Sequence, residues 1–301
     1  MTSTLPATES INPRYRDIDA WDAPTALGAM WEAQMAATAA VQPALPAIAA
    51  AAIAAAARLA SGTGRLVYAG AGTSGRIGVQ DGAELPPTFN WPLERLVLLM
   101  AGGDIAFTRS IENAEDDREA GTAAIAAHAI ATHDVVIGTA ASGSTPYTVA
   151  VLHAARTAGA LTIGLSNSAA GAILHAAEHP ILVETGAEAI AGSTRMKAGT
   201  AQKIVLNLLS SQVMIQLGHV HHGLMVDMQA KNEKLRHRAL RMLRHLTAVD
   251  DEATLRAALE AAGGRVKPAV LILHGMNAAA AAALLDRSAG RLRTALQEIG
   301  K

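Results

Sequence analysis

The sequence predicts an α/β protein with a parallel sheet, and three observations carry this prediction. Short apolar runs of strand character alternate with stretches of helical composition through the middle of the 301-residue chain. Such alternation is typical of a parallel sheet covered by helices. Half of the residues are hydrophobic but only 3% are aromatic, so the core must be built from aliphatic side chains on closely packed, alanine-rich helices.

The elements follow one another in a regular order. Residues 25–60 predict two helices, because the prolines within residues 42–46 cannot lie inside one continuous helix. Further helices are predicted over residues 198–217 and over the basic segment 231–247. The strands are predicted at Arg65 to Ala69, Leu96 to Met100, Val135 to Ile137, Leu161 to Leu165 and Ile181 to Val183.

The last fifty residues predict a small helical appendage. Two or three helices rich in alanine and leucine are expected there, with breaks at Gly263, Gly264 and the pair Lys267-Pro268. The expected domains are an N-terminal segment with helices (1–60), a sheet domain (61–235) and a C-terminal helical subdomain (236–301).

Charge and composition exclude several classes of protein. The chain has 25 Lys and Arg against 26 Asp and Glu, so no field of one sign attracts it to nucleic acid or to a membrane surface. The absence of cysteine excludes disulfides, thiolate nucleophiles and cysteine-bound zinc. No apolar run has the roughly 20 residues of a spanning helix, and the first residues lack a secretory pattern. We expect a cytoplasmic protein without nucleic-acid or membrane partners.

The loop after the first predicted strand is rich in glycine. Residues 70–76 (GAGTSGR) would let backbone N–H groups approach an anion and would add two hydroxyls near a helix start. The loop has the glycine spacing of the dinucleotide fingerprint, but it differs in context, because no acidic residue ends the next strand. The candidate binding residues here are Gly72, Thr73, Ser74, Gly75 and Arg76.

Two further loops concentrate hydroxyl groups at helix starts, at the sheet edge where ligands bind in open parallel sheets. Residues 140–146 carry three hydroxyls, and helix capping explains one of them but not all three. Residues 192–200 place Arg195 and Lys197 where cations oppose the helix dipole, which indicates an anionic ligand. The candidates are Ser142, Gly143, Ser144 and Thr145 in one loop, and Ser193, Thr194, Arg195 and Lys197 in the other.

Together these segments resemble a known family. The pattern of strands and loops is similar to sugar isomerase (SIS) domains, which bind phosphosugars on a flavodoxin-like, three-layer αβα fold. The resemblance spans most of residues 8–235, including Thr8-Glu9 and the segment 224–235, and one motif is shared with the glucokinase regulatory protein. The motifs GAGTSGR, DGAELPPTF, ENAED, GTAASGSTPY and GAEAIAGSTRMKAGTAQK, in this order, resemble the N-acetylmuramic acid 6-phosphate etherase family.

The resemblance implies an enzyme that removes the D-lactyl ether from a phosphorylated amino sugar. With the sugar ring open, loss of the C2 proton would permit elimination of lactate from C3, and water would then add. Such chemistry needs a base, an acid and a fixed phosphate, and no metal or other cofactor is expected. The family's two catalytic glutamates correspond to Glu84 and Glu115, and Glu84 is expected to be partly desolvated.

Other implications of the resemblance concern Glu188 and the assembly. SIS-type isomerases carry a glutamate five positions before a Ser-Thr pair, so Glu188 is an expected substrate contact. Many etherases have arginine where this chain has Ser144, and Arg76, Arg195 or Lys197 would compensate. A homodimer is implied as well. Two other functions stay open at this point: a phosphosugar-sensing regulatory protein and an aldose-ketose isomerase.

Overall fold

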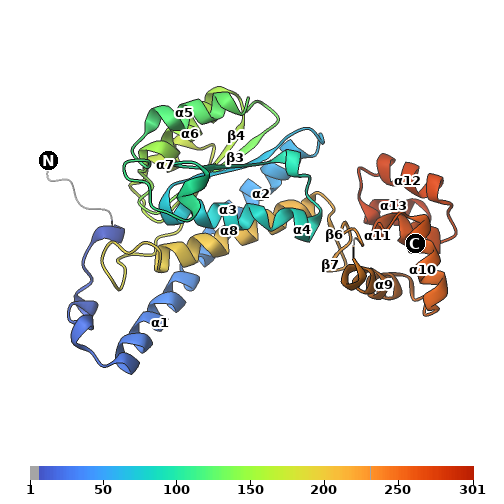
Figure 1. The fold of residues 1–301 in the computed structure, drawn as a ribbon, viewed down its shortest axis with the longest axis horizontal. Coiled ribbons are helices and arrows are strands. Elements are labelled where there is room, and N and C mark those ends of the chain that lie inside the picture. The colour runs from blue at the N-terminus through green and yellow to red at the C-terminus, as the bar shows by residue number, and fades with distance from the viewer. Residues whose placement is uncertain (1–6, 231) are drawn as a thin grey trace. The chain divides into compact units, whose positions relative to one another are not determined.

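A computed structural model describes residues 7–230 and 232–301 of the protein (Figure 1). The chain forms two compact units. The first contains the described residues up to Ala83 together with Glu94–Gln212, and the second contains Glu84–Leu93 together with Val213–Lys301. Each unit encloses a hydrophobic core of its own. The three-domain division expected from the sequence stays a prediction.

The first unit is built on a five-stranded parallel sheet in the order β2-β1-β3-β4-β5. This is the flavodoxin-like order, in which ligands bind at the carboxyl ends of β1 and β3. All residues of β1, β3 and β4 are buried, as expected for strands covered on both faces. The predicted sheet is confirmed. Its strands are β1 (Leu66–Gly70), β2 (Leu96–Met100), β3 (Val135–Ala140), β4 (Leu161–Ser166) and β5 (His179–Leu182).

Helices cover both faces of this sheet. Figure 1 shows α5, α6 and α7 on one face and α2, α3 and α8 on the other. On the first face, Val67 and Val136 of the sheet pack with Leu152 of α6 in one buried cluster. The three-layer αβα prediction is therefore confirmed. The helices are α1 (Ala23–Ala39), α2 (Leu45–Leu59), α3 (Gly72–Ala83), α5 (Arg118–Ala127), α6 (Pro146–Thr157), α7 (Ala172–Ala176) and α8 (Lys197–Gln216). Short 3-10 turns lie at Ala7–Glu9, Pro13–Tyr15, Ile18–Ala20, Gln42–Ala44, Leu93–Arg95 and Asp104–Phe107.

The N-terminal helices α1 and α2 are separated at the break that was predicted from the two prolines. Helix α1 begins after Asp22, whose side chain accepts a hydrogen bond from the Thr25 amide. Between the helices, Pro43 lies in a 3-10 turn, and Pro46 lies in the first turn of α2. A proline is tolerated there because its missing N–H would have had no partner in the helix.

One helical stretch of the described chain, Ala23–Leu59, has the length and hydropathy of a membrane span, and 39% of its apolar 18-residue window is buried. The bent pair α11 (Val266–Leu273) and α12 (Ala278–Arg287) would count as a second only if both helices formed one span. Core helices of soluble proteins share these properties. Helix α2 contacts β3, β4 and β5, and buries Ile48, Ala52 and Leu59. Its apolar side chains therefore serve the packing of the first unit.

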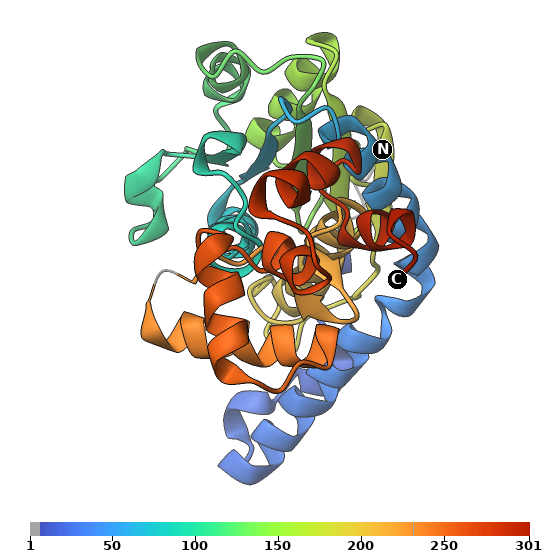
Figure 2. The same cartoon turned by 90° about the vertical axis from the view of Figure 1, so that its right-hand side faces the viewer.

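The second unit is mainly helical, and Figure 2 shows its C-terminal helices in orange and red. Its buried cluster includes Val226, Leu243, Leu255 and Val270. Besides the helices it has a hairpin of two very short strands, which the sequence analysis missed. The elements are α4 (Leu85–Phe89), β6 (Val220–His221), β7 (Leu224–Met225), α9 (Glu233–Thr247), α10 (Glu252–Ala261), α11 (Val266–Leu273), α12 (Ala278–Arg287) and α13 (Leu292–Glu298).

The predicted break at Lys267-Pro268 is wrong. Both residues lie in the first turn of α11, where a proline removes no hydrogen bond. Lys267 is buried, and its Nζ donates to the Asp227 carboxylate and, at 2.7 Å, to the Gly290 carbonyl. His219 Nδ1 lies 2.7 Å from the same carboxylate. The pair of residues expected to interrupt the chain thus begins a helix and anchors a polar network.

Candidate functional site

Three loops of the first unit enclose a cavity of about 500 Å³ at the carboxyl edge of the sheet. This volume lies within the usual range of small-molecule sites. One loop follows β1, the second follows β3 and the third precedes α8. The cavity is lined by Glu9, Ala71, Gly72, Thr73, Ser74, Glu115, Asp116, Ala141, Ser142, Ser144, Thr145, Pro146, Gly192 and Thr194.

The glycine loop allows α3 to begin directly on the end of β1. A Cβ added at Gly70 would lie 2.8 Å from the Gly75 backbone, and one at Gly75 would lie 2.4 Å from the Met100 sulfur. Gly72 has a φ of +52° and faces open space, since no heavy atom lies within 4 Å of its Cβ position. The backbone of Gly72 therefore borders the cavity, and Thr73 and Ser74 lie beside it on the first turn of α3.

The second loop presents hydroxyl groups at the N-terminus of α6. Gly143 has a φ of +70°, and a Cβ there would lie 2.3 Å from the Ser166 hydroxyl, so only glycine fits this turn. The Ser144 amide donates to the Ser142 hydroxyl at 3.2 Å. Thr145 occupies the N-cap of α6, but its side chain makes no capping hydrogen bond. Its hydroxyl thus stays available to an anion at the positive end of the helix dipole.

The third loop is fixed by Glu188, which is only 1% exposed. Its carboxylate accepts the backbone N–H groups of Lys197 at 2.8 Å and Ala198 at 2.9 Å. Burial raises the pKa of Glu188, although these two hydrogen bonds and the Lys197 charge oppose the shift. Glu188 therefore caps α8, and its expected contact with substrate stays a prediction. Of the hydroxyls in this loop, Thr194 lines the cavity and Ser193 does not.

Arg76, Arg195 and Lys197 were expected to compensate for the arginine that many etherases have in place of Ser144. Two of these three cations donate to backbone carbonyls instead. Arg76 Nε donates to the carbonyls of Ala106 and Phe107 at 3.0 and 3.1 Å. Lys197 Nζ donates to the Ala187 carbonyl at 3.0 Å, and burial lowers the pKa of this amine. Arg195 is exposed and directly follows Thr194, a residue of the cavity wall. It makes no hydrogen bond or ion pair within the described part of the chain.

Glu115 is held at the cavity by its backbone. The Tyr147 amide of α6 donates to the Glu115 carbonyl at 2.9 Å, so the glutamate is tied to the helix start that carries Thr145. Its side chain is exposed and borders both the main cavity and a neighbouring cavity of about 200 Å³. Glu115 and the predicted hydroxyls of Ser74, Ser142, Ser144 and Thr145 therefore surround one space.

Glu84 lies elsewhere on the chain. It directly follows Ala83, the last residue of α3, whereas the cavity is at the first turn of that helix. A helix of 12 residues is about 18 Å long. The helix is fixed on the sheet by the Tyr68 hydroxyl, which donates to Asp81 at 2.9 Å. The Glu84 side chain is exposed, so the expectation that it is partly desolvated is wrong for a single chain.

Two acidic residues of the cavity wall were not predicted as site residues. Asp116 follows Glu115 directly, and adjacency could have indicated it. Glu9 lies more than sixty positions before the first glycine loop, and its motif was noted only for the family resemblance. With Glu115, these are the charged residues that line the cavity, and all three are acidic.

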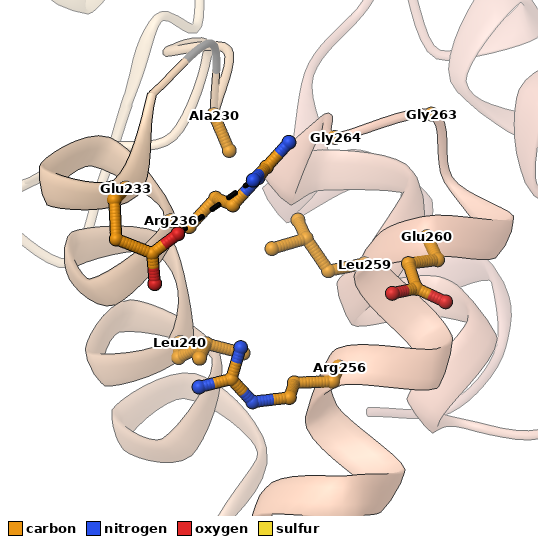
Figure 3. A pocket seen from close by; sticks show the side chains of 9 residues that line it. All are labelled: Ala230, Glu233, Arg236, Leu240, Arg256, Leu259, Glu260, Gly263 and Gly264. Carbon is orange, nitrogen blue, oxygen red and sulfur yellow. Dashed lines mark ion pairs between the residues drawn. The ribbon is translucent and has the colours of Figure 1, made fainter.

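The second unit contains a cavity of a different kind (Figure 3), of about 430 Å³. Arg236 of α9 and Arg256 of α10 extend into it from opposite walls, and Leu240 and Leu259 form apolar surface between them. Both arginines already have acidic partners. The Arg236 Nη1 atom lies 3.6 Å from Glu233 Oε2, and the Arg256 Nη2 atom lies 2.6 Å from Glu252 Oε1.

Comparison with known proteins gives consistent matches. Residues 48–156 match the family described as glucokinase regulatory protein N-terminal SIS domain. An N-acetylmuramic acid 6-phosphate etherase of Deinococcus radiodurans is 48% identical over 97% of this chain and 95% of its own length. The etherase of Streptomyces avermitilis is 48% identical over 96% of this chain and 93% of its own length. That of Symbiobacterium thermophilum is 54% identical over 72% of this chain and 72% of its own length. Among solved structures, a phosphoheptose isomerase of Francisella tularensis is 20% identical, with 65% of this chain and 98% of that chain covered and a TM-score of 0.48.

Proposed function

The chain belongs to the family of N-acetylmuramic acid 6-phosphate etherases, and from this premise we propose how its cavity performs the reaction. The enzyme cleaves the D-lactyl ether at C3 of the sugar, giving N-acetylglucosamine 6-phosphate and D-lactate. One observation carries the proposal: Glu115 shares a single cavity with the hydroxyl groups of Ser74, Ser142 and Thr145. A carboxylate and an anion cradle can thus act on the same sugar phosphate.

The hydroxyl loops hold the phosphate. The first turns of α3 and α6 direct backbone N–H groups and Ser or Thr hydroxyls towards an anion, and both helix dipoles favour it. Among the described residues, no side chain that lines the cavity is cationic, so positive charge must come from beside the cavity. Arg195 supplies this charge, because Arg76 and Lys197 are already bound to backbone carbonyls.

The reaction proceeds by elimination and addition. With the sugar ring open, a carboxylate removes the C2 proton, which the neighbouring C1 aldehyde acidifies. The electron pair forms a C2–C3 double bond, the C3–O bond breaks, and the lactate oxygen leaves with a proton from a carboxylic acid. Water then adds its oxygen to C3 and gives one proton to the carboxylate so formed, and the proton first removed returns to C2. Glu115 and Glu84 share these proton transfers, each of which is the kind of step that a positioned carboxylate accelerates about 10²- to 10⁴-fold.

The two glutamates meet across a homodimer. Since α3 separates Glu84 from the cavity of its own chain by about 18 Å, Glu84 serves the cavity of a second copy. An apolar helix face supports such an assembly: Leu27, Trp31 and Met35 of α1 are spaced by four residues and are 63%, 63% and 52% exposed. Side chains at this spacing share one face of a helix, and a large exposed apolar face indicates an interface. We place the dimer in the cytoplasm, with which a cysteine-free chain is compatible.

A mixing experiment tests both the activity and the shared site. Wild-type protein should release D-lactate from N-acetylmuramic acid 6-phosphate, and Glu84→Gln and Glu115→Gln should each lower the rate of release by about 10²- to 10⁴-fold. When the two variants are unfolded, mixed in equal amounts and refolded together, about half of the dimers are mixed, each with one intact site. About a quarter of wild-type activity should therefore return.

The control refolds each variant alone, which should restore nothing. Absence of lactate release by the wild-type protein would refute the etherase function itself. Release by the wild-type protein but none by the mixture would instead refute the shared site, because two glutamates acting within one chain cannot complement each other.

A further inference from the structure

Glu9 is a carboxylate of the cavity to which the proposed reaction gives no task. It borders the same space as Glu115 and Thr145 but belongs to the N-terminal 3-10 turn Ala7–Glu9. Its side chain is exposed, and within the described part of the chain it makes no hydrogen bond or ion pair. An unpaired carboxylate that lines a ligand cavity is available to bind part of the ligand.

The local structure holds Glu9 in this place. Thr8, the preceding residue, is fully buried and fixes the turn against the protein. On the other side, Gly192 has a φ of +75°, and a Cβ at this position would lie 3.0 Å from Glu9 Oε2. The carboxylate therefore lies over a residue without a side chain, in the loop that also carries Thr194.

The chemistry of a carboxylate limits what Glu9 can bind. An ionised carboxylate only accepts hydrogen bonds, so it cannot hold the phosphate or the lactyl carboxylate of the substrate. It can accept a hydrogen bond from a hydroxyl group. In the closed sugar, C2 bears the amide, C3 the ether, C5 the ring oxygen and C6 the phosphate. The hydroxyl donors of the closed form are those at C1 and C4, and those of the open form are at C4 and C5, so the C4 hydroxyl is the one present in both forms. The amide N–H at C2 is the other donor common to both forms, and a 4-deoxy substrate distinguishes the two.

We propose that Glu9 orients the substrate by accepting a hydrogen bond from its C4 hydroxyl. This position lies between the phosphate end and the reacting C3 atom, so a bond there fixes the angle at which C2 and C3 meet the acid–base groups. The inference rests on the proposed function, and it makes Glu9 a positioning residue and not an acid or a base.

Two substitutions test the assignment. Glu9→Ala should lower kcat/KM for lactate release by about 10- to 100-fold, the range for losing a hydrogen bond to a charged group. Glu9→Gln keeps an acceptor oxygen and should recover part of this loss. Both variants should keep the wild-type thermal midpoint and the wild-type affinity for inorganic phosphate, because the hydroxyl loops are untouched. Glu119→Gln, an exposed acid on α5 outside the cavity wall, is the matched control.

A substrate without the C4 hydroxyl identifies the contact. Wild-type enzyme should process this 4-deoxy compound about as slowly as Glu9→Ala processes the normal substrate. The two losses should not add when variant and compound are combined, because both remove the same hydrogen bond. Full additivity, or wild-type kcat/KM in Glu9→Ala, would overturn the proposal.

Gly192 offers a second route to the same result. Gly192→Ala adds a methyl group against the Glu9 carboxylate and should lower kcat/KM for the normal substrate more than for the 4-deoxy compound. Gly223→Ala, at a glycine with the same φ of +75° and no atom within 4 Å of the new Cβ, should have no effect. If wild-type protein released no lactate, the etherase function would fail. The Glu9 assignment would then be decided by whether Glu9→Ala weakens binding of N-acetylglucosamine 6-phosphate but not of inorganic phosphate, and equal weakening of both would refute it.

Discussion

The two units each enclose a cavity of similar size, but they line it with different groups. In the first unit, loops at strand ends contribute glycine backbone, hydroxyls and carboxylates. In the second, the sides of α9 and α10 contribute arginines that are already paired with Glu233 and Glu252. In the first cavity the carboxylates of Glu9 and Glu115 have no partner among the described residues, whereas in the second both arginines are paired.

This difference teaches where function can be sought in the chain. Unpaired polar groups cost stability, and a protein keeps them where a ligand will supply the missing partners. Paired side chains between two helices contribute to folding instead. Substitutions in the first cavity should therefore change activity without changing stability, and substitutions in the second unit should do the reverse.

The largest effect is expected for Glu115→Gln. This change removes a proton-transfer group and should lower kcat by about 10²- to 10⁴-fold. The side chain is exposed and unpaired within the described residues, so the thermal midpoint should not move. Steady-state lactate release and a thermal melt would measure both quantities, with Glu119→Gln as control. A fall in the melting temperature equal to that of a core variant would contradict the comparison.

The next effect concerns the buried network of the second unit. Lys267→Met removes the buried partner of the half-buried Asp227, and breaking a buried pair typically costs about 3 kcal/mol of unfolding free energy. Burial tends to raise the pKa of Asp227, but hydrogen bonds from His219 and the charge of Lys267 lower it. Urea unfolding would measure the loss. Lys234→Met, at an exposed position of α9, should change little, and an equal loss there would remove the distinction.

A smaller effect is expected from acid. Burial, then the charges of His222 and Arg293, lower the pKa of His221 from 6.5 to about 4. The unfolded chain therefore binds a proton at higher pH than the folded one, so stability should fall as the pH drops from 6.5 towards 4. His221→Gln should flatten this slope in urea unfolding at several pH values. His237→Gln, at an exposed site on α9, should leave the slope unchanged; the same flattening in both variants would exclude His221 as its source.

The smallest effect is expected for Arg256→Ala in the second cavity. Its pair with Glu252 is an exposed pair one helical turn apart, and such pairs contribute little to stability because water screens the two charges. Lactate release should stay at the wild-type rate. A clear loss of activity in folded Arg256→Ala protein would mean that this cavity, too, takes part in the reaction.

Much of the first unit could be predicted from the sequence. Strands such as β2 and β3 are continuous apolar runs between glycine-rich or helical segments, so their presence was clear and their ends shifted by only a few residues. The second unit was less predictable. The strands β6 and β7 have two residues each and show no periodicity, and Pro268 lies at one of the few helix positions that tolerate proline.

The residues of the candidate site also differ in how well the sequence predicted them. Hydroxyls and glycines next to a strand end, such as Ser74 and Thr145, could be found because the sheet brings strand ends together. Glu9 could not be assigned, because nothing local connects it with a loop so far along the chain. The position of Glu84 depends on the length of α3. This helix begins at the cavity and continues for 12 residues, so Glu84 lies at its far end. The capping role of Glu188 depends on backbone geometry that composition does not reveal.

The contact between Gly70 and Gly75 has a mechanical consequence. Without side chains between them, α3 rests directly on the end of β1 and cannot tilt independently of the strand. Helix α3 then carries a phosphate-binding turn at its first residues, and Glu84 directly follows its last residue. In the proposed dimer, binding of substrate in one cavity would shift α3 and with it the Glu84 that serves the other cavity, so the two active sites should turn over as a coupled pair.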